Sequence, residues 1–327
     1  MSKTNKIFKY FSLVDISTYR SELMGCAILW IMMLHFTFTQ IKPLGFIAQY
    51  GFAGVEIFMF VSGFGLFFSL DKNRDYKRFY RKRLLRIFPT YYILGIFDSI
   101  FLFHDSLFTY LFRYTTIGFW TGGIYWEWYI PSIVLLYLIA PLLKFFFDKR
   151  WFNLITVIAI ATLFSAWLVI DKDQILDRSH FFLLYRVSAF ILGMTCAYWI
   201  EHNINCKYYL ILLAVGIPIF MVLFPHHHHI YNYKYYSLLF LLPLFILAFT
   251  FIAKYLKFTN PILSLIGKAS LETYLIQCIF FHAIITEQIS IPQQWHDIIT
   301  VSLILLCSIL GITAHWAIER SGINRFI

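Results

Sequence analysis

Residues 20–36 read RSELMGCAILWIMMLHF, an apolar run with charges only at its start and a histidine one residue before its end. A helix needs roughly 20 mainly apolar residues to cross a hydrocarbon core of about 30 Å. We therefore expect this stretch to form most of a membrane-crossing helix.

Similar apolar runs follow along the whole chain. Together with the first they predict ten spans, at residues 22–40, 49–70, 88–103, 126–147, 151–170, 181–200, 208–224, 235–253, 269–287 and 299–318. Residues 105–122 are amphipathic, and we expect them to lie at the outer interface. No gap between spans is long enough for a soluble domain. The predicted fold is an all-α polytopic membrane bundle with about ten transmembrane helices, forming a single domain over residues 1–327.

The composition agrees with a membrane protein. Of the 327 residues, 60% are hydrophobic and 13% are charged, whereas soluble domains carry about a quarter charged residues. The net charge of +10 comes from Lys and Arg clustered in short loops, which is typical of cytoplasmic loops of membrane proteins and argues against nucleic-acid binding. With both termini cytoplasmic, the inner segments hold about 21 of the 27 Lys and Arg. We expect a multi-pass protein of the cytoplasmic (inner) membrane.

His35 is the first candidate for catalysis because an ionisable residue inside a span is costly and usually functional. Histidine can also accept and donate a proton near neutral pH. Arg20 and Glu22, at the cytoplasmic start of the same helix, are the further catalytic candidates. Arg20 precedes His35 by roughly 22 Å along the axis and lies within about 60° of its face. The alternatives are a structural histidine bonded to a neighbouring helix and an arginine that reaches lipid phosphate.

The next candidate is a basic run over residues 71–89, DKNRDYKRFYRKRLLRIFP. Dense Arg and Lys pair well with phosphate, so we expect this run to bind a polyphosphorylated ligand such as coenzyme A, or anionic lipid. The residues assigned to cofactor binding are Arg78, Arg81, Lys82, Arg83 and Arg86.

Three outer residues, Glu127, Trp128 and Arg186, are candidates for binding substrate. A carboxylate among aromatic rings suits carbohydrate, although it also suits an ordinary interfacial aromatic belt. Asp98, like Arg186, is a charge within a span that we expect to face the bundle interior. His282 and His315 also lie in spans, and we assign them no role. The run His226–His229 is interpreted as a loop, and no metal site is expected.

Six stretches, taken together, resemble the acyltransferase-3 family of multi-spanning membrane acyltransferases, in the family's order. They are residues 22–35, which end in a characteristic histidine; 51–64, with aromatics leading into Ser-Gly-Phe; 78–89, closing on Arg-Ile-x-Pro; 128–141, beginning Trp-aromatic and ending Tyr-x-x-x-Pro; 186–193, Arg-x-x-x-Phe-x-x-Gly; and 267–275, Gly-Lys-x-Ser-Leu-x-x-Tyr-Leu.

The resemblance implies transfer of an acyl group, usually acetyl from acetyl-CoA, to a sugar hydroxyl. It implies that His35 is the general base, that the basic run meets the coenzyme A phosphates and that Arg186 lies in the cavity. One departure concerns the first helix, where the family often has an arginine ten intervening residues before the histidine and this chain has Met24. Arg20, one turn earlier and offset by about 40°, is the candidate replacement.

The expected function is therefore a membrane O-acyltransferase that uses acetyl-CoA as co-substrate. The expected partners are the lipid bilayer and an envelope glycan or lipid-linked saccharide as acceptor. The alternative is a transporter or flippase for a glycan or lipid-linked sugar, and a regulatory membrane protein is a third possibility. The sequence identifies neither the acceptor nor the oligomeric state.

Overall fold

The computed structural model describes residues 12–72, 75–121, 128–170, 178–204, 207–225 and 232–322. All regular secondary structure within these ranges is helical. The helices are α1 (Leu13–Thr18), α2 (Arg20–Phe36), α3 (Lys42–Ala48), α4 (Ala53–Lys72), α5 (Tyr76–Asp98), the π-helix η3 (Ser99–Phe103), α6 (Leu107–Tyr114), α7 (Ile117–Trp120), α8 (Tyr129–Asp148), α9 (Phe152–Ile170), α10 (Arg178–Glu201), α11 (Lys207–Leu223), α12 (Asn232–Phe240), α13 (Leu242–Tyr255), the 3₁₀ turn η5 (Lys257–Thr259), α14 (Asn260–Lys268), α15 (Ser270–Ile285), the 3₁₀ turn η6 (Gln293–Trp295) and α16 (His296–Arg320).

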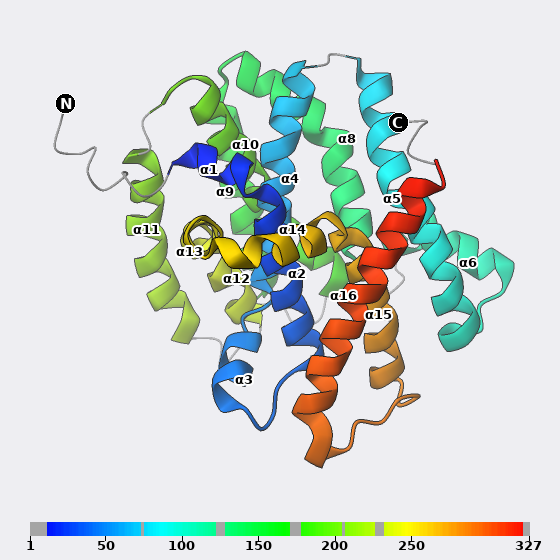
Figure 1. Ribbon diagram of the computed structural model, residues 1–327. Coiled ribbons are helices and arrows are strands. Elements are labelled where there is room, and N and C mark those ends of the chain that lie inside the picture. The colour runs from blue at the N-terminus through cyan, green and yellow to red at the C-terminus, as the bar shows by residue number, and fades with distance from the viewer. Residues whose placement is uncertain are drawn as a thin grey trace.

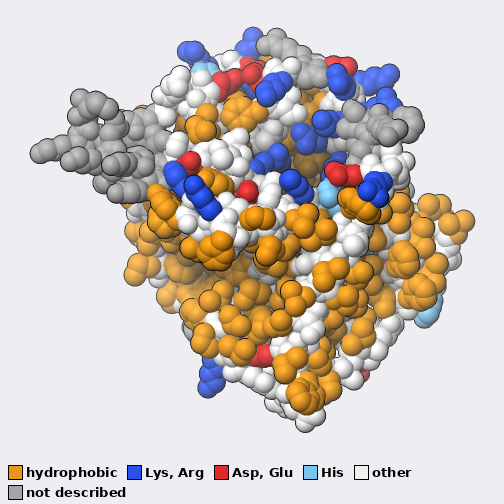
Figure 2. Space-filling view, in the orientation of Figure 1, with side chains coloured by type: hydrophobic (Ala, Val, Ile, Leu, Met, Phe, Trp, Pro, Cys, Tyr) orange, Lys and Arg blue, Asp and Glu red, His pale blue; other side chains and the backbone are white. Residues whose placement is uncertain are grey.

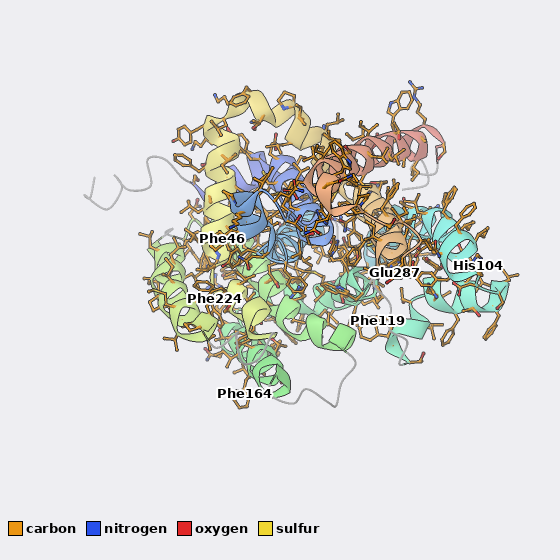
Figure 3. The ribbon with its side chains drawn as sticks, turned by 90° about the horizontal axis from the view of Figure 1, so that it is seen from below. Phe46, His104, Phe119, Phe164, Phe224 and Glu287 are labelled. Carbon is orange, nitrogen blue, oxygen red and sulfur yellow. The ribbon has the colours of Figure 1, made fainter. Side chains whose placement is uncertain are left out.

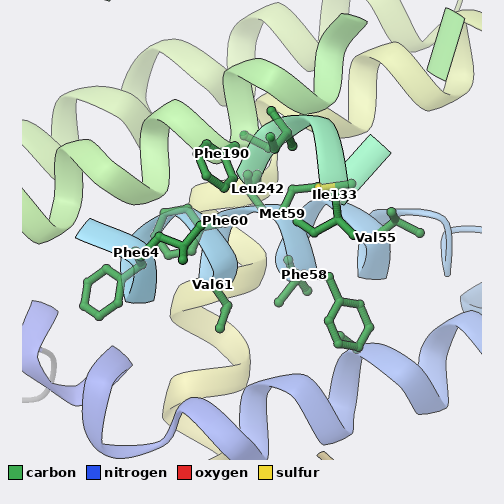
Figure 4. Close-up of a cluster of buried hydrophobic side chains, with 14 of the residues drawn as sticks. Val55, Phe58, Met59, Phe60, Val61, Phe64, Ile133, Phe190 and Leu242 are labelled. Carbon is green, nitrogen blue, oxygen red and sulfur yellow. The ribbon is translucent and has the colours of Figure 1, made fainter. Parts of the chain in front are cut away.

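Helix α4 forms the centre of the bundle, between α2 and α10 (Figures 1 and 4). Its side chains are apolar on nearly every face, as expected for a helix surrounded by others rather than by solvent. The side chains of Phe60 and Phe64 are almost fully buried there, with Phe190 of α10 beside them. This core positions α2, which carries His35.

The crossing of α4 and α10 depends on a glycine in each helix. A Cβ atom added at Gly63 would collide with the Phe190 carbonyl, and one added at Gly193 would collide with the Phe60 carbonyl. Small residues allow helix backbones to approach closely, which is the usual way that helices associate in membranes. The glycines of Ser-Gly-Phe in α4 and Phe-x-x-Gly in α10 therefore allow the two backbones to pack directly against each other.

Helices α13 and α14 form a broken pair bent by 88°. Pro261 stands in the first turn of α14, where proline favours the start of a new helix because its missing N–H needs no partner. As a result α14 runs across α2 instead of parallel to it (Figure 1). Lys268, at the end of α14, lines the same cavity as Arg20 of α2.

The number of membrane spans differs from the expectation. Each of the ten expected stretches overlaps a helix, but among the described residues four helices are long and apolar enough to cross a membrane, or five with the bent pair. The four are Ala53–Lys72, Tyr76–Phe103, Tyr129–Asp148 and Gln293–Arg320, and shorter apolar helices accompany them. The described helices thus include several with the length and composition to cross a membrane, whereas ten spans and cytoplasmic termini are not confirmed.

Charge and apolar surface are separated along the bundle. Figure 2 shows Lys and Arg side chains on the upper part of the face that α14 and α16 cover, and hydrophobic side chains over the lower part. Figure 3 looks onto the opposite end, where Phe46 of α3 and Glu287 after α15 are seen. Helix α1 and the C-terminal end of α16 both lie towards the basic end (Figure 1). The arrangement agrees with an asymmetric placement across a bilayer.

Candidate functional site

A cavity of about 280 Å³ runs along one face of α2. Helix α2 contributes Arg20, Met24 and Ile31 to its wall. His35 does not line the cavity, but it lies four residues after Ile31, one helical turn further along and about 40° away on the same face. The cavity therefore leads from the basic end of α2 towards His35.

The two ends of this cavity differ in chemistry. Four cations line it near the start of α2: Arg20, Arg83, Arg86 and Lys268. The remaining wall is largely apolar and aromatic, with contributions from α4, α8 and α15, including Phe58, Tyr129, Tyr137 and Tyr274. A cationic end joined to an aromatic interior suits a ligand that is anionic at one end and uncharged at the other.

Arg20 and Arg83 are the cations with capacity to bind an anion. The Nε atom of each is buried and has no hydrogen-bond partner in the part of the chain that the structure describes. The Arg20 guanidinium lies against Gly65 of α4, and Arg83 lies over the rings of Phe79 and Tyr137, at 5.7 Å and 5.9 Å. Buried donors that lack partners are costly. Both side chains are therefore suited to donate hydrogen bonds to a phosphate group.

Arg86, by contrast, is already engaged. Its Nη1 atom lies 2.5 Å from Oε1 of Glu272, a carboxylate with no exposed surface, and Nη2 lies 3.2 Å from Oε2. Nη2 also donates to the Lys268 carbonyl at 3.3 Å. This forked pairing largely neutralises the charge of Arg86 and links α5 to α15. Arg86 therefore forms part of the cavity wall but offers little free positive charge to a ligand.

The other predicted cofactor-binding residues lie away from the cavity. Arg78, Arg81 and Lys82 are exposed on α5 and are not part of the wall. Asp75 caps this helix by accepting a hydrogen bond from the Arg78 N–H at 3.0 Å. Glu22 is half-buried in the first turn of α2 and also lies outside the cavity wall. The structure thus brings together Arg20, Arg83 and Arg86 from the predicted set.

His35 lies in a polar cluster between α2 and α15. Its ring stacks on Phe281, with centroids 4.6 Å apart. Gln277, one turn earlier on α15, faces the same imidazole. The Nδ1 atom of His35 and both amide atoms of Gln277 are buried without a hydrogen-bond partner among the described residues. An imidazole with a free nitrogen in such a place can accept a proton from a bound substrate.

A second histidine, which carried no role in the sequence interpretation, lies beside this cluster. Nδ1 of His282 lies 3.1 Å from both carboxylate oxygens of Asp98, and the Tyr114 hydroxyl donates to Asp98 at 3.1 Å. All three side chains are buried. The sequence showed only that Asp98 and His282 are ionisable residues in apolar runs. Because 184 positions separate them, it did not indicate that they form a pair.

Arg186 forms a buried ion pair with Glu56 of α4, at 2.5 Å. Its guanidinium also lies over the rings of Phe52 and Trp128, at 4.5 Å and 5.0 Å. Trp128, which precedes α8, therefore contacts Arg186. Neither residue is part of the cavity wall, and their assignment to substrate binding stays a prediction. Glu127 lies outside the described residues.

Replacing Glu56 with glutamine is expected to destabilise the protein by about 3–5 kcal/mol, because it leaves the buried Arg186 charge without its carboxylate. The double variant E56L/R186M, which removes both charges, is expected to recover most of this loss. Thermal unfolding of the purified variants in detergent measures both effects. Equal stability of wild type and E56Q would contradict a structural role for the pair.

Comparisons with known proteins agree with the resemblance. The family model described as an acyltransferase domain matches residues 23–318. A protein of Acidianus two-tailed virus, provisionally named an acetyltransferase, is 30% identical over 183 residues. That match spans 53% of this chain and 53% of the viral protein, about half of each. No solved structure matches the chain.

Proposed function

The chain belongs to this acyltransferase family, and we propose that it transfers an acyl group, most readily acetyl, from acyl-CoA to a sugar hydroxyl of an envelope glycan. The family supports acyl transfer in general. The donor, the acceptor and a multi-pass location in the inner membrane are parts of the proposal. The acceptor is a cell-envelope polysaccharide or a lipid-linked saccharide.

The observation that carries the proposal is the shape and charge of the cavity along α2. Coenzyme A is long and narrow, with phosphates at one end and the thioester at the other. At the cationic end of the cavity, the Nε groups of Arg20 and Arg83 have no hydrogen-bond partner among the described residues, and the wall beyond them is aromatic. From Arg20 to Ile31 is roughly 16 Å along the helix axis, a distance suited to the pantetheine arm.

In this arrangement the arginines hold the phosphates and the thioester lies near Ile31, one turn from His35. His35 takes the proton from the acceptor hydroxyl, whose oxygen forms a bond to the acyl carbon. The carbon–sulfur bond breaks, and the proton passes from His35 to the departing sulfur, giving free coenzyme A. The apolar and aromatic part of the cavity wall limits the access of water, which would otherwise hydrolyse the thioester.

The test uses the purified chain in lipid nanodiscs with acetyl-CoA labelled in the acetyl group and crude envelope glycan. We expect label in the glycan as a base-labile ester, together with an equal amount of free thiol. A chain that leaves acetyl-CoA intact but moves glycan or lipid-linked sugar across vesicle membranes would instead be a transporter. Label that remains entirely in acetyl-CoA would overturn the proposed reaction.

A further inference from the structure

Three buried polar atoms between α2 and α15 have no hydrogen-bond partner in the part of the chain that the structure describes. They are Nδ1 of His35 and the amide atoms Oε1 and Nε2 of Gln277. Gln277 has no exposed surface, so bulk water does not solvate its amide. An amide buried in this way costs free energy and calls for a further role. Gln277 carried no role in the sequence interpretation.

The contacts of α15 place the Gln277 amide beside the His35 ring. Helix α15 packs against α2, and its Phe281 stacks on the imidazole with centroids 4.6 Å apart and an interplanar angle of 21°. Gln277 precedes Phe281 by four residues, so the two side chains share one face of α15, one turn apart. The amide faces the imidazole without a well-formed hydrogen bond to it. The three atoms therefore form a single polar cluster.

This polar cluster lies where the cavity along α2 ends. Helices α2 and α15 both run away from the basic end of the bundle (Figure 1), and Ile31 and Tyr274 are the last residues of these two helices that line the cavity. His35 follows Ile31 by one turn, and Gln277 follows Tyr274 by nearly one turn. Side chains on a helix tilt towards its N-terminus, so both polar groups are directed back towards the cavity.

The chemistry of the three atoms identifies the ligand group that fits them. With the imidazole neutral and its proton on Nε2, Nδ1 of His35 accepts a hydrogen bond, as does Oε1 of Gln277, whereas Nε2 of Gln277 donates. A thioester carbonyl only accepts, so it would pair with the Gln277 donor and leave the other two atoms without partners.

Two neighbouring hydroxyls satisfy the whole cluster. One hydroxyl donates to Nδ1 of His35 and accepts from Nε2 of Gln277, because a hydroxyl is both donor and acceptor. A second hydroxyl, on the adjacent carbon, donates to Oε1 of Gln277. Adjacent hydroxyls of this kind are the common feature of sugar rings, which makes a sugar a better match than an isolated alcohol.

We propose that Gln277 binds the acceptor sugar: its Nε2–H donates to the hydroxyl that gives its proton to Nδ1 of His35, and its Oε1 accepts from the neighbouring hydroxyl. The inference rests on the proposed function and adds to it the residue that recognises the acceptor. Gln277 gains and loses no proton. It holds the O–H bond directed at His35 while the hydroxyl oxygen bonds to the acyl carbon and the sulfur leaves.

The experiment compares Q277M with wild type in lipid nanodiscs, using labelled acetyl-CoA and increasing amounts of crude envelope glycan. Methionine keeps the length of the side chain and removes both polar atoms. We expect kcat/KM for glycan to fall about 10- to 100-fold, because substrate hydroxyls lose their partners, with the KM for acetyl-CoA within about twofold of wild type. Wild-type kcat/KM for glycan in Q277M would overturn the inference.

Thermal unfolding of the same variant separates acceptor binding from folding. Because Gln277 buries two polar atoms that lack partners among the described residues, the apolar methionine should leave the unfolding temperature equal to that of wild type or higher. A lower unfolding temperature, or a failure to fold, would make Gln277 a structural residue and overturn the inference.

The matched control is T273V, one turn earlier on the same helix. The Thr273 hydroxyl is also buried without a partner in the described part of the chain, but it lies against Gly311 of α16 instead of His35. We expect T273V to transfer acetyl at the wild-type rate. A loss in T273V equal to that in Q277M would assign the effect to helix packing and overturn the inference.

A double variant tests whether Gln277 and His35 act on the same hydroxyl. Adding Q277M to H35A should lower the remaining transfer little further, because residues that act as a unit are not additive. An independent loss of about 10- to 100-fold in the H35A background, the size expected for Q277M alone, would contradict the shared hydroxyl.

A simple diol tests the second hydroxyl. We expect cis-1,2-cyclohexanediol to inhibit glycan acetylation by wild type at about tenfold lower concentration than cyclohexanol, and Q277M to lose this preference. Equal inhibition of wild type by the two compounds would overturn the assignment of a sugar diol. A wild type that transfers no acetyl overturns the proposed function, whereas transfer that depends on His35 but not on Gln277 overturns this inference alone.

Discussion

Replacing His35 with alanine reduces acyl transfer about 1,000-fold while acetyl-CoA still binds with near-normal affinity. The rate falls because the variant lacks the group that takes the hydroxyl proton, a contribution typically of 10²–10⁴-fold. Binding persists because Arg20, at the cationic end of the cavity, lies roughly 22 Å away along α2. The measurement is transfer of labelled acetyl to glycan, alongside a direct binding assay.

The matched control for this variant is H202A. His202 follows α10, is partly exposed and stacks on Tyr198, so its loss removes an imidazole far along the chain from α2. We expect H202A to transfer acetyl at the wild-type rate. Turnover by H35A above a tenth of the wild-type rate would make His35 a structural residue and contradict its assignment as the base.

Replacing Arg20 or Arg83 with alanine is expected to weaken acetyl-CoA binding about 10- to 100-fold each. Hydrogen bonds to charged groups contribute roughly 1.5–3 kcal/mol, and 1.4 kcal/mol corresponds to a factor of ten in affinity. Acetyl-pantetheine has the same thioester without phosphates, so the two substitutions should leave its use unchanged. Measuring both donors with each variant isolates the phosphate contact.

Arg81 provides the control for the arginine variants. It lies on the same helix as Arg83, two positions earlier, but it is exposed and outside the cavity wall. R81A should bind acetyl-CoA within about twofold of wild type at physiological salt, because exposed charges are screened. An equal loss in R81A and R83A would assign the phosphates to the surface of α5 instead of the cavity.

Much of the helical framework could be predicted from sequence, because hydropathy reports directly on apolar length. Each expected span overlaps a helix, including the first, residues 22–40, whose part up to Phe36 lies in α2. The count of membrane spans could not be predicted equally well. Apolar composition does not reveal where a span breaks, as between α13 and α14, where the chain turns by 88°.

The candidate site could be predicted only in its broad location. The sequence indicated a basic segment for phosphate, but it did not distinguish Arg83, which has no ion pair among the described residues, from Arg86, which pairs with Glu272. That difference depends on α15 packing against α5. The pairs Asp98–His282 and Glu56–Arg186 were missed for the same reason, since contacts between distant helices leave no periodic signal.

The structure places Arg20 close to Met24, which stands at the position where the family often has an arginine. Both residues line the same cavity, one turn apart on α2. Because the long Arg20 side chain reaches Gly65, it can present its guanidinium where a residue at position 24 would otherwise do so. This geometry supports the expectation that Arg20 replaces the family arginine, which the arginine variants test.

The most direct test of the account is a structure of the protein with acetonyl-CoA, in which a methylene group stands between the sulfur and the acetyl carbonyl, so that there is no thioester bond to break. The account predicts phosphates at Arg20 and Arg83, the pantetheine arm along Met24 and Ile31, and the acetonyl carbonyl within one helical turn of His35. A nucleotide held at Arg78, Arg81 and Lys82, with the arm outside the cavity, would contradict it.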